Sequence, residues 1–224
     1  MSERQNDMTV FRGFKANYAF FIPYLIFLLG GGFVLVIWNK PEIHLFINNY
    51  HSPGFDIFFR YCTLIGLGWL IIPVVLGVSF LRLRYVISSL AAFLLSTIIN
   101  DTIKQVVGAA RPAEYFGEMH QSLYYVPGVE IYHWNSFPSG HSATAFCLFC
   151  ILALVMRSNI AKFAWFVIAL LVAYSRMYLS EHFLIDVYAG SIVGVLSTII
   201  CYYTAMKMEW LNKFPAMDKP LLKL

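Results

Sequence analysis

The sequence predicts an all-α, polytopic membrane protein, and three observations support this: its composition, its charge content and the length of its apolar runs. Of the 224 residues, 59% are hydrophobic and only 12% are charged, and the mean hydropathy is +0.67. A soluble globular domain usually carries about 25% charged residues, so this chain has too few to cover a water-facing surface. Six apolar runs approach the roughly 20 residues that a helix needs to cross a bilayer. We therefore expect one membrane-embedded domain over residues 1–224, with six transmembrane helices.

The predicted spans follow the chain in order, and most of the connections between them are short. They cover residues 18–38, 56–81, 85–106, 139–156, 161–180 and 183–206. Gly66, Gly68 and Pro73 interrupt the second span, which predicts a break or a kink there. Only a few residues separate the last two spans, so the turn between them must be tight.

The remaining segments differ in composition. Residues 1–17 are polar, and the apolar run after them is too long for the core of a signal peptide, so we expect a tail followed by a retained helix. Residues 41–50 mix apolar and polar side chains, which is typical of a short helix in the membrane interface. Residues 109–138 form the one long connection, and residues 207–224 form a second tail.

The distribution of basic residues predicts the orientation. If the N-terminus is cytoplasmic, eleven of the 16 Lys and Arg residues fall in cytoplasmic segments and five fall outside. Cytoplasmic loops carry the excess of Lys and Arg in membrane proteins. We therefore expect a multi-pass protein of the cytoplasmic (inner) membrane, with both termini in the cytoplasm and the loop 109–138 on the extracytoplasmic side.

The sequence supports neither nucleic-acid binding nor a cysteine-based metal or redox site. The net charge of +4 is modest and no polar face gathers the basic residues, so we expect no nucleic-acid partner. Cys147 and Cys150 have a CxxC spacing, but they lie in an apolar run without a second pair of ligands. We interpret them as packing residues and predict neither a metal nor a cofactor.

Three polar clusters interrupt the apolar chain, and the predicted topology brings all three to the same membrane face. The first cluster lies at the end of the third span, the second at the start of the fourth, and the third around the turn between the last two spans. They are Lys104 with Arg111-Pro112, then Pro138-Ser139-Gly140-His141, and then Ser175-Arg176 with His182 and Asp186.

The cations in these clusters predict a phosphate pocket. A Lys or Arg at the centre of a bilayer costs about 2.5–3.5 kcal/mol on insertion scales, and mutual repulsion adds to the cost. A dianionic phosphate compensates Lys104, Arg111 and Arg176, and backbone N–H groups of Ser139 and Gly140 at a helix start also favour an anion. The alternative interpretation of each Lys or Arg, taken alone, is that its side chain extends to the membrane surface and binds no phosphate.

The histidines predict the reaction. His182 and Asp186 are four residues apart, so they share a face if both lie on one helix. A carboxylate bonded to one ring nitrogen fixes the tautomer and leaves the other nitrogen free to attack phosphorus. His141, near a helix start, is placed to act as a general acid toward the leaving oxygen. This chemistry requires no metal.

Together the patterns Lys104-x6-Arg111-Pro112, Pro138-Ser139-Gly140-His141 and Ser175-Arg176-x5-His182-x3-Asp186 resemble the three-part signature of the type 2 phosphatidic acid phosphatase superfamily. This group includes lipid phosphate phosphatases, undecaprenyl pyrophosphate phosphatases and, more distantly, vanadium haloperoxidases. The resemblance implies a role for each matching residue. It assigns His182 as nucleophile, Asp186 as its orienting group, His141 as acid, and Lys104, Arg111, Ser139, Gly140 and Arg176 as phosphate ligands.

The leading hypothesis is a phosphatase for phosphatidic acid, phosphatidylglycerol phosphate, undecaprenyl pyrophosphate or a lipid A phosphate, acting through a phosphohistidine. A lipid phosphotransferase with the same site and a non-enzymatic anion transporter are the alternatives; six spans argue against a haloperoxidase. Loop residues His120, His133, Glu114 and Glu118 either shape head-group specificity or are simply solvated. The sequence fixes neither the head group and tail nor the oligomeric state.

Overall fold

The computed structural model describes residues 15–208 and 213–221, and this part of the chain contains helices and no strand. The all-α class is therefore confirmed. Most of the predicted tail 1–17 and part of the tail 207–224 lie outside the described residues. The helices are α2 (Tyr18–Ile37), α3 (Lys40–Asn48), α4 (Pro53–Cys62), η1 (Thr63–Gly66), η2 (Gly68–Leu70), α5 (Ile71–Ser79), α6 (Leu83–Val107), α7 (Pro112–Glu118), α8 (Gly140–Val155), α9 (Asn159–Tyr178), α10 (Leu184–Lys207) and η4 (Pro215–Asp218).

Long apolar helices make up a large part of the described chain. Four helical stretches are long and apolar enough to cross a bilayer, namely α2, Leu83–Glu118, α9 and α10. A fifth span results if Pro53–Gly66 and Gly68–Ser79, which are bent by 59° relative to each other, count as one. Helix α8 has 16 residues and is just short of the usual 17–25 residues. The count of six therefore stays a prediction.

The break in the second span occurs at the glycines that predicted it. Leu67 has extended backbone angles between η1 and η2. A Cβ atom on Gly66 would lie 2.7 Å from Val172 Cγ1 and 3.0 Å from His141 Cβ. Only glycine lets the backbone approach α8 and α9 this closely, so the break brings η1 directly against the start of α8.

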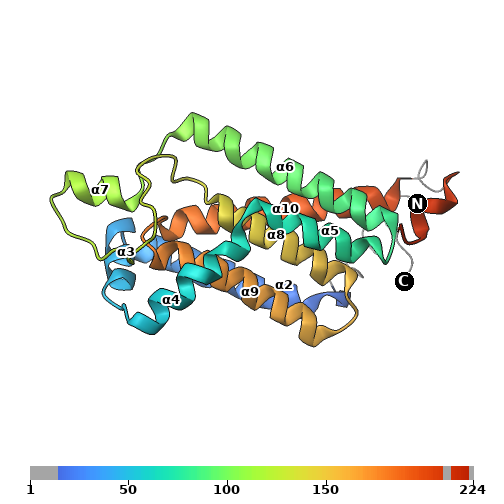
Figure 1. Ribbon diagram of the computed structural model, residues 1–224, viewed down its shortest axis with the longest axis horizontal. Coiled ribbons are helices and arrows are strands. Elements are labelled where there is room, and N and C mark those ends of the chain that lie inside the picture. The colour runs from blue at the N-terminus through green and yellow to red at the C-terminus, as the bar shows by residue number, and fades with distance from the viewer. Residues whose placement is uncertain (1–14, 209–212, 222–224) are drawn as a thin grey trace.

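Helix α8 lies in the middle of the bundle, with α6, α9 and α10 packed around it (Figure 1). Two glycines let α10 approach it closely. A Cβ atom on Gly190 would lie 2.4 Å from the carbonyl oxygen of Ser139, and one on Gly194 would lie 2.3 Å from that of Ala143. Small residues four apart are a common device for close helix packing in membranes. This pair was not predicted from the sequence.

We expect Gly190→Ala to lower the thermal unfolding temperature of the purified protein in detergent, because the added methyl group forces α10 away from α8. Overpacking of this kind costs about 1–3 kcal/mol. Gly30→Ala in α2 is the matched control, since a Cβ atom there meets nothing within 4 Å. Equal unfolding temperatures for the two variants would contradict the close α8–α10 contact.

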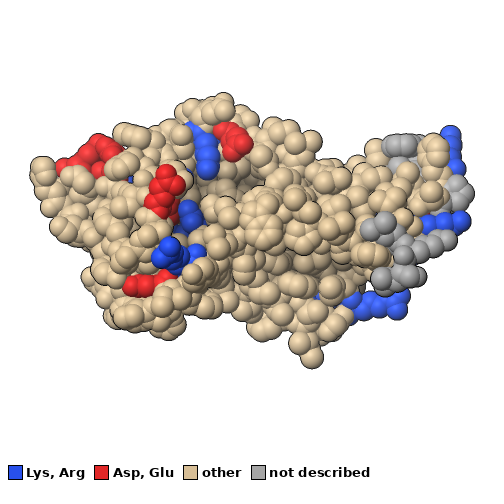
Figure 2. Space-filling model, in the orientation of Figure 1, with Lys and Arg blue, Asp and Glu red and all other residues tan. Residues whose placement is uncertain are grey.

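The two ends of the bundle differ. The start of α2, the end of α10 and η4 lie at one end, and α3, α7 and the loop after α7 lie at the other (Figure 1). The visible face in Figure 2 carries charged side chains toward both ends and an uncharged band between them. The short helix predicted at 41–50 is α3, which begins with a capping box between Asn39 and Glu42. Helix α7 was not predicted; it starts at Pro112, a residue well suited to the first position of a helix.

Candidate active site

The three polar clusters meet at the end of the bundle that carries α3 and α7 (Figure 1). The backbone N–H of Ser139 donates to the carbonyl of Asp186 at 2.9 Å, which joins the second cluster to the third. The guanidinium of Arg111 forms an ion pair with Glu181, which joins the first cluster to the third. A methyl group on Gly140 would lie 3.5 Å from Lys104 Nζ, so the first and second clusters are also adjacent.

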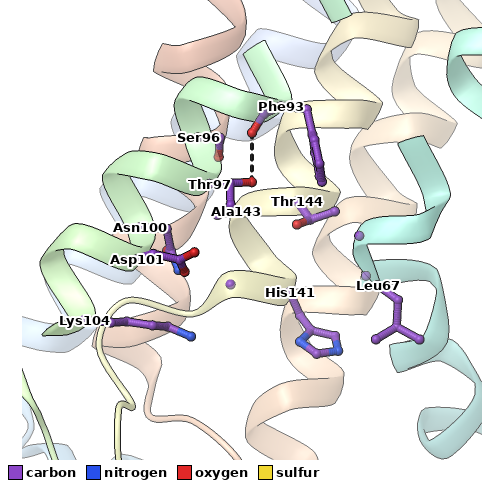
Figure 3. Close-up of a pocket in the computed structure, with 13 residues that line it drawn as sticks. Leu67, Phe93, Ser96, Thr97, Asn100, Asp101, Lys104, His141, Ala143 and Thr144 are labelled. Atoms are coloured by element: carbon purple, nitrogen blue, oxygen red, sulfur yellow. Dashed lines mark hydrogen bonds between the residues drawn. The ribbon is translucent and has the colours of Figure 1, made fainter. Parts of the chain in front are cut away.

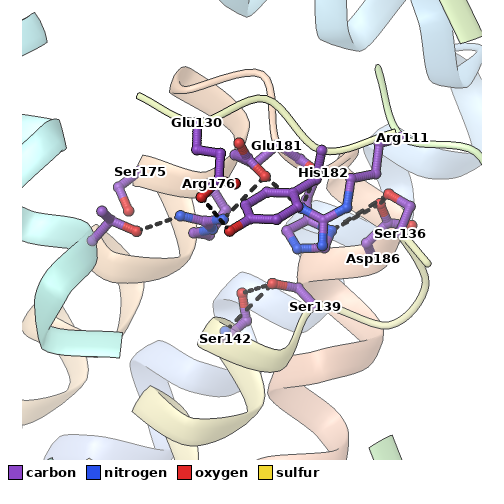
Figure 4. A network of polar contacts seen from close by, with 12 residues as sticks. Arg111, Glu130, Ser136, Ser139, Ser142, Ser175, Arg176, Glu181, His182 and Asp186 are labelled. Carbon is purple, nitrogen blue, oxygen red and sulfur yellow. Dashed lines mark hydrogen bonds and ion pairs between the residues drawn. The ribbon is translucent and has the colours of Figure 1, made fainter. Parts of the chain in front are cut away.

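A buried network holds His182. Its Nδ1 atom lies 3.4 Å from Asp186 Oδ2, and both side chains are almost fully buried. The same carboxylate oxygen accepts hydrogen bonds from the Ser136 hydroxyl at 2.5 Å and from the backbone N–H of Phe183 at 2.9 Å. Three groups therefore surround one carboxylate oxygen, and Nε2 is the ring nitrogen of His182 that makes no contact with Asp186 or Ser136 (Figure 4).

The pairing of His182 with Asp186 does not arise in the expected way. The spacing predicted that both residues share a helical face if they lie on one helix, but α10 begins only at Leu184 and His182 lies in the turn before it. Asp186 instead caps the start of α10 through the N–H of Phe183. The backbone N–H groups of Glu181 and His182 both donate to the carbonyl of Arg176, which fixes the turn at the end of α9.

Glu181 belongs to this network, although the sequence analysis assigned it no role. Its carboxylate lies between the two arginines, paired with Arg111 and 3.3 Å from Arg176 Nη2 (Figure 4). Burial raises the pKa of Glu181, and the positive charges of Arg176 and Arg111 oppose that rise. Ser136 was missed as well, because nothing in its own neighbourhood in the sequence distinguishes it from other loop serines.

Each arginine side chain makes a second polar contact in addition to its ion pair with Glu181. Arg176 Nη1 donates to the hydroxyl of Thr63 at 2.6 Å, so η1 holds one end of its guanidinium. Arg111 Nε donates to the carbonyl of Trp134 at 2.9 Å, and the Tyr132 ring lies 5.1 Å from Arg111 Cζ. Arg111 and Arg176 are thus fixed in direction by groups from three different segments, as a binding site for a defined anion requires.

The start of α8 carries the remaining predicted residues. Ser139 is the N-cap, and its hydroxyl accepts from the backbone N–H of Ser142 at 3.4 Å and from the Ser142 hydroxyl at 3.0 Å. Its own N–H is occupied by Asp186, as described above. Lys104 and His141 line one cavity of about 210 Å³ together with Gly140 (Figure 3). The structure therefore assembles every predicted site residue at one end of the bundle, while their individual roles stay proposals.

Comparison with known families agrees with this arrangement. Residues 85–210 match the model of the PAP2 superfamily, and this range includes all of the residues above from Lys104 to Asp186. The chain belongs to the PAP2 superfamily.

Individual relatives of this PAP2 protein are similar over different lengths. The lipid A 4'-phosphatase of Bacteroides thetaiotaomicron is 26% identical over 178 residues, which cover 75% of this chain and 77% of that protein. The bacitracin transport permease protein BcrC of Bacillus licheniformis is 33% identical over 79 residues, 35% of this chain, so the match spans only 38% of that relative. The crystal structure of LpxE from Aquifex aeolicus superposes with a TM-score of 0.66 at 27% identity, covering 75% of this chain and 98% of that one.

The side chains of the other candidates in this PAP2 protein have no bond to the central network, although the backbone carbonyl of His133 accepts from the N–H of Arg111 at 2.8 Å. His133 Nδ1 is 2.8 Å from Glu114 Oε2, and both side chains are at least partly exposed. His120 and Glu118 are exposed on and after α7. Cys147 and Cys150 are buried free thiols in α8. Within residues 15–208 and 213–221, no group of three or more His, Cys, Asp or Glu side chains is arranged to hold a metal ion.

The buried histidines predict a pH dependence of stability. Burial lowers the pKa of His182 to about 4, although Asp186 favours its charged form, and burial also lowers the pKa of His44 in α3 to about 4. Between pH 6.5 and 4 the unfolded chain therefore binds protons that the folded protein does not, so stability rises with pH in this window. We expect the thermal unfolding temperature to fall as the pH is lowered from 6.5 to 4.

Two variants check this expectation. His44→Gln should reduce the slope of unfolding temperature against pH, because one of the two buried imidazoles is gone. His133→Gln, at an exposed position, should leave the slope unchanged. A slope that is the same in all three proteins would show that the buried histidines do not cause it.

Proposed function

We propose that this PAP2 protein is a metal-independent membrane phosphatase that hydrolyses a lipid phosphate through a phosphohistidine at His182. The observation that carries the proposal is the geometry around this residue. Nδ1 of His182 lies 3.4 Å from Asp186 Oδ2, and His182 follows directly after Glu181, the residue that joins the guanidinium groups of Arg111 and Arg176. A pocket of fixed cations next to an oriented imidazole suits attack on phosphorus.

The proposed reaction has two steps. In the first, Nε2 of His182 attacks phosphorus, the bond from phosphorus to the lipid oxygen breaks, and His141 donates a proton to that oxygen. In the second, water attacks the phosphohistidine, His141 takes up a proton from the water, and inorganic phosphate leaves as the nitrogen–phosphorus bond breaks. Asp186 stabilises the positive charge that develops on the ring, since it accepts from the other nitrogen.

Charge stabilisation comes from the arginines and Lys104. Phosphoryl transfer places negative charge on the three equatorial oxygens of the transition state, and fixed cations there lower the barrier. The phosphate binds to the guanidinium groups of Arg111 and Arg176, while Glu181 holds both side chains in place. The N–H of Gly140, at the first position of α8, adds a helix N-terminus to the pocket. Ser139 supports this pocket by capping α8.

The proposed membrane arrangement keeps six spans, with α8 and the bent α4–α5 segment counted as one span each. Both chain termini are cytoplasmic and the site faces the extracytoplasmic side. The start of α2 and the end of α10 lie at the opposite end of the bundle from the site, which supports this arrangement (Figure 1). A reporter fused to the C-terminus should therefore behave as cytoplasmic.

The substrate class follows from the relatives and from the setting of the site. One relative is a lipid A 4'-phosphatase, and a site at the end of apolar helices suits a substrate whose tail stays in the bilayer. Phosphatidic acid, phosphatidylglycerol phosphate, undecaprenyl pyrophosphate and a lipid A phosphate are the candidates. Because one relative is named a transport permease, transport is the second function to be tested.

One assay tests the proposal. The purified full-length protein in detergent is incubated with each candidate lipid in the presence of EDTA, and inorganic phosphate is measured without and with an acceptor lipid. We expect phosphate release in EDTA without acceptor. Release only with added divalent ions contradicts the metal-free mechanism, and dependence on an acceptor indicates a phosphotransferase. Phosphate uptake by vesicles without hydrolysis indicates a transporter.

A further inference from the structure

A cavity adjoins the proposed phosphate pocket on the side of His141. It lies between α6, the first turns of α8 and the break at Gly66–Gly68, and its volume is about 210 Å³ (Figure 3). Lys104 and His141 form the end of the cavity nearest the site, and Leu67 and Phe93 form an apolar wall. The volume is below the roughly 300–1,000 Å³ of pockets that enclose a whole drug-sized ligand. The cavity therefore has room for one segment of a lipid, not for the entire molecule.

The lining of this cavity is unusually polar for a helix in a bilayer. Ser96, Thr97, Asn100 and Asp101 of α6 and Thr144 of α8 all line it. Polar and ionisable side chains inside membrane spans are rare and usually mark a functional path or site. Asp101 is exposed, so its side chain is not packed between the helices of the bundle.

Asn100 is the strongest indication of a ligand. Its side chain is only 2% exposed, and its Oδ1 atom has no hydrogen-bond partner among the described residues. Its Nδ2 atom would lie 3.5 Å from a methyl group on Gly140, the same distance as Lys104 Nζ one helical turn further on. A buried amide oxygen without a partner destabilises a protein, so a bound group that donates to the amide offsets this loss.

We propose that this cavity is the subsite for the leaving group, and that it selects a phosphomonoester of a neutral alcohol bearing hydroxyl or amide groups, such as a glycerol backbone or an amino sugar. The proposal rests on the proposed function. A general acid must contact the oxygen that it protonates, so the alcohol lies on the side of His141. The hydroxyl and amide side chains of α6 then meet polar groups next to the phosphate, and the tail extends into the bilayer.

The same lining disfavours a polyprenyl pyrophosphate. Its leaving group is a second phosphate on a hydrocarbon chain, which brings negative charge close to the Asp101 carboxylate and leaves the Asn100 amide unpaired. Sites built to hydrogen-bond a substrate discriminate strongly against analogues that lack the matching group. Selectivity between these substrate classes is therefore the property that reports on the subsite.

The test compares kcat/KM for phosphate release from dioctanoyl phosphatidic acid, an acylated glucosamine phosphate and farnesyl pyrophosphate. We expect the wild type to favour the first or second substrate over the third; which of the two is better distinguishes glycerol from sugar. Asn100→Leu should lower kcat/KM for the favoured substrate by roughly tenfold, the equivalent of one hydrogen bond, and change the value for farnesyl pyrophosphate by less than about twofold. Asp101→Asn should raise the value for farnesyl pyrophosphate relative to the favoured substrate.

Gln105→Leu is the control, because Gln105 is exposed on the same helix and does not line the cavity. It should leave all three values unchanged. If Asn100→Leu lowers all three equally and Asp101→Asn changes no ratio, the side chains serve packing alone and the subsite is refuted while the phosphatase remains. If the wild type releases phosphate from none of the substrates, the proposed function itself fails and the subsite falls with it.

Discussion

We expect His182→Asn to reduce phosphate release by roughly three orders of magnitude or more, because the substitution removes the nitrogen that attacks phosphorus. The side chain is 1% exposed and its Nδ1 lies 3.4 Å from Asp186 Oδ2, which leaves Nε2 as the ring nitrogen for the attack. Asparagine is smaller than histidine and still offers a donor toward the Asp186 carboxylate. The measurement is the single-turnover rate with a radiolabelled lipid phosphate.

His120→Asn is the matched control for this loss. His120 is exposed after α7 and has a positive φ of 54°, a conformation that asparagine tolerates well. It should retain full activity. Quenching the reaction during turnover should trap labelled phosphate on the wild type and on His120→Asn but not on His182→Asn. Equal labelling of all three proteins would place the covalent intermediate elsewhere or remove it from the mechanism.

The helices were predictable because apolar runs and polar flanks mark span ends directly. The run predicted at 85–106 corresponds to α6, Leu83–Val107, and the run at 139–156 corresponds to α8, Gly140–Val155. In the second case the local chemistry is explicit, because Ser139 caps the helix and Pro138 stands before it. The glycines at 66 and 68 likewise predicted the break in the second span, since they lack the side chains that would keep the backbone at a distance.

Contacts between distant segments were not predictable in the same way. Ser136 bonds to a carboxylate 50 residues further along the chain, and no sequence pattern links the two. Glu181 reads as an ordinary polar residue in a tight turn until Arg111 and Arg176 are seen to converge on it. The conformation of the turn before α10 could not be predicted either, because the four-residue spacing of His182 and Asp186 is compatible both with a shared helix and with a helix cap.

Arg176→Lys should lower kcat/KM by about 10²–10³-fold, the usual effect of removing one fixed donor from a transition-state anion. The guanidinium of Arg176 bonds to Thr63 with one nitrogen and approaches Glu181 with another, and it is 6% exposed. A lysine carries a single ammonium group, which cannot contact both partners and still present a planar fork to a phosphate. Positive charge is retained in the variant, so the loss measures geometry instead of net charge.

Arg60→Lys separates this effect from a general intolerance of lysine at the same end of the bundle. Arg60 is exposed on α4 and donates to the carbonyl of Pro127 at 3.3 Å, away from the cluster around Glu181. It should keep near wild-type kcat/KM. Inhibition by vanadate provides the second readout: Arg176→Lys should weaken it in parallel with kcat/KM, because the same guanidinium binds both anions. If vanadate inhibition stays unchanged while activity falls, Arg176 acts by holding η1 against the turn and does not contact the phosphate.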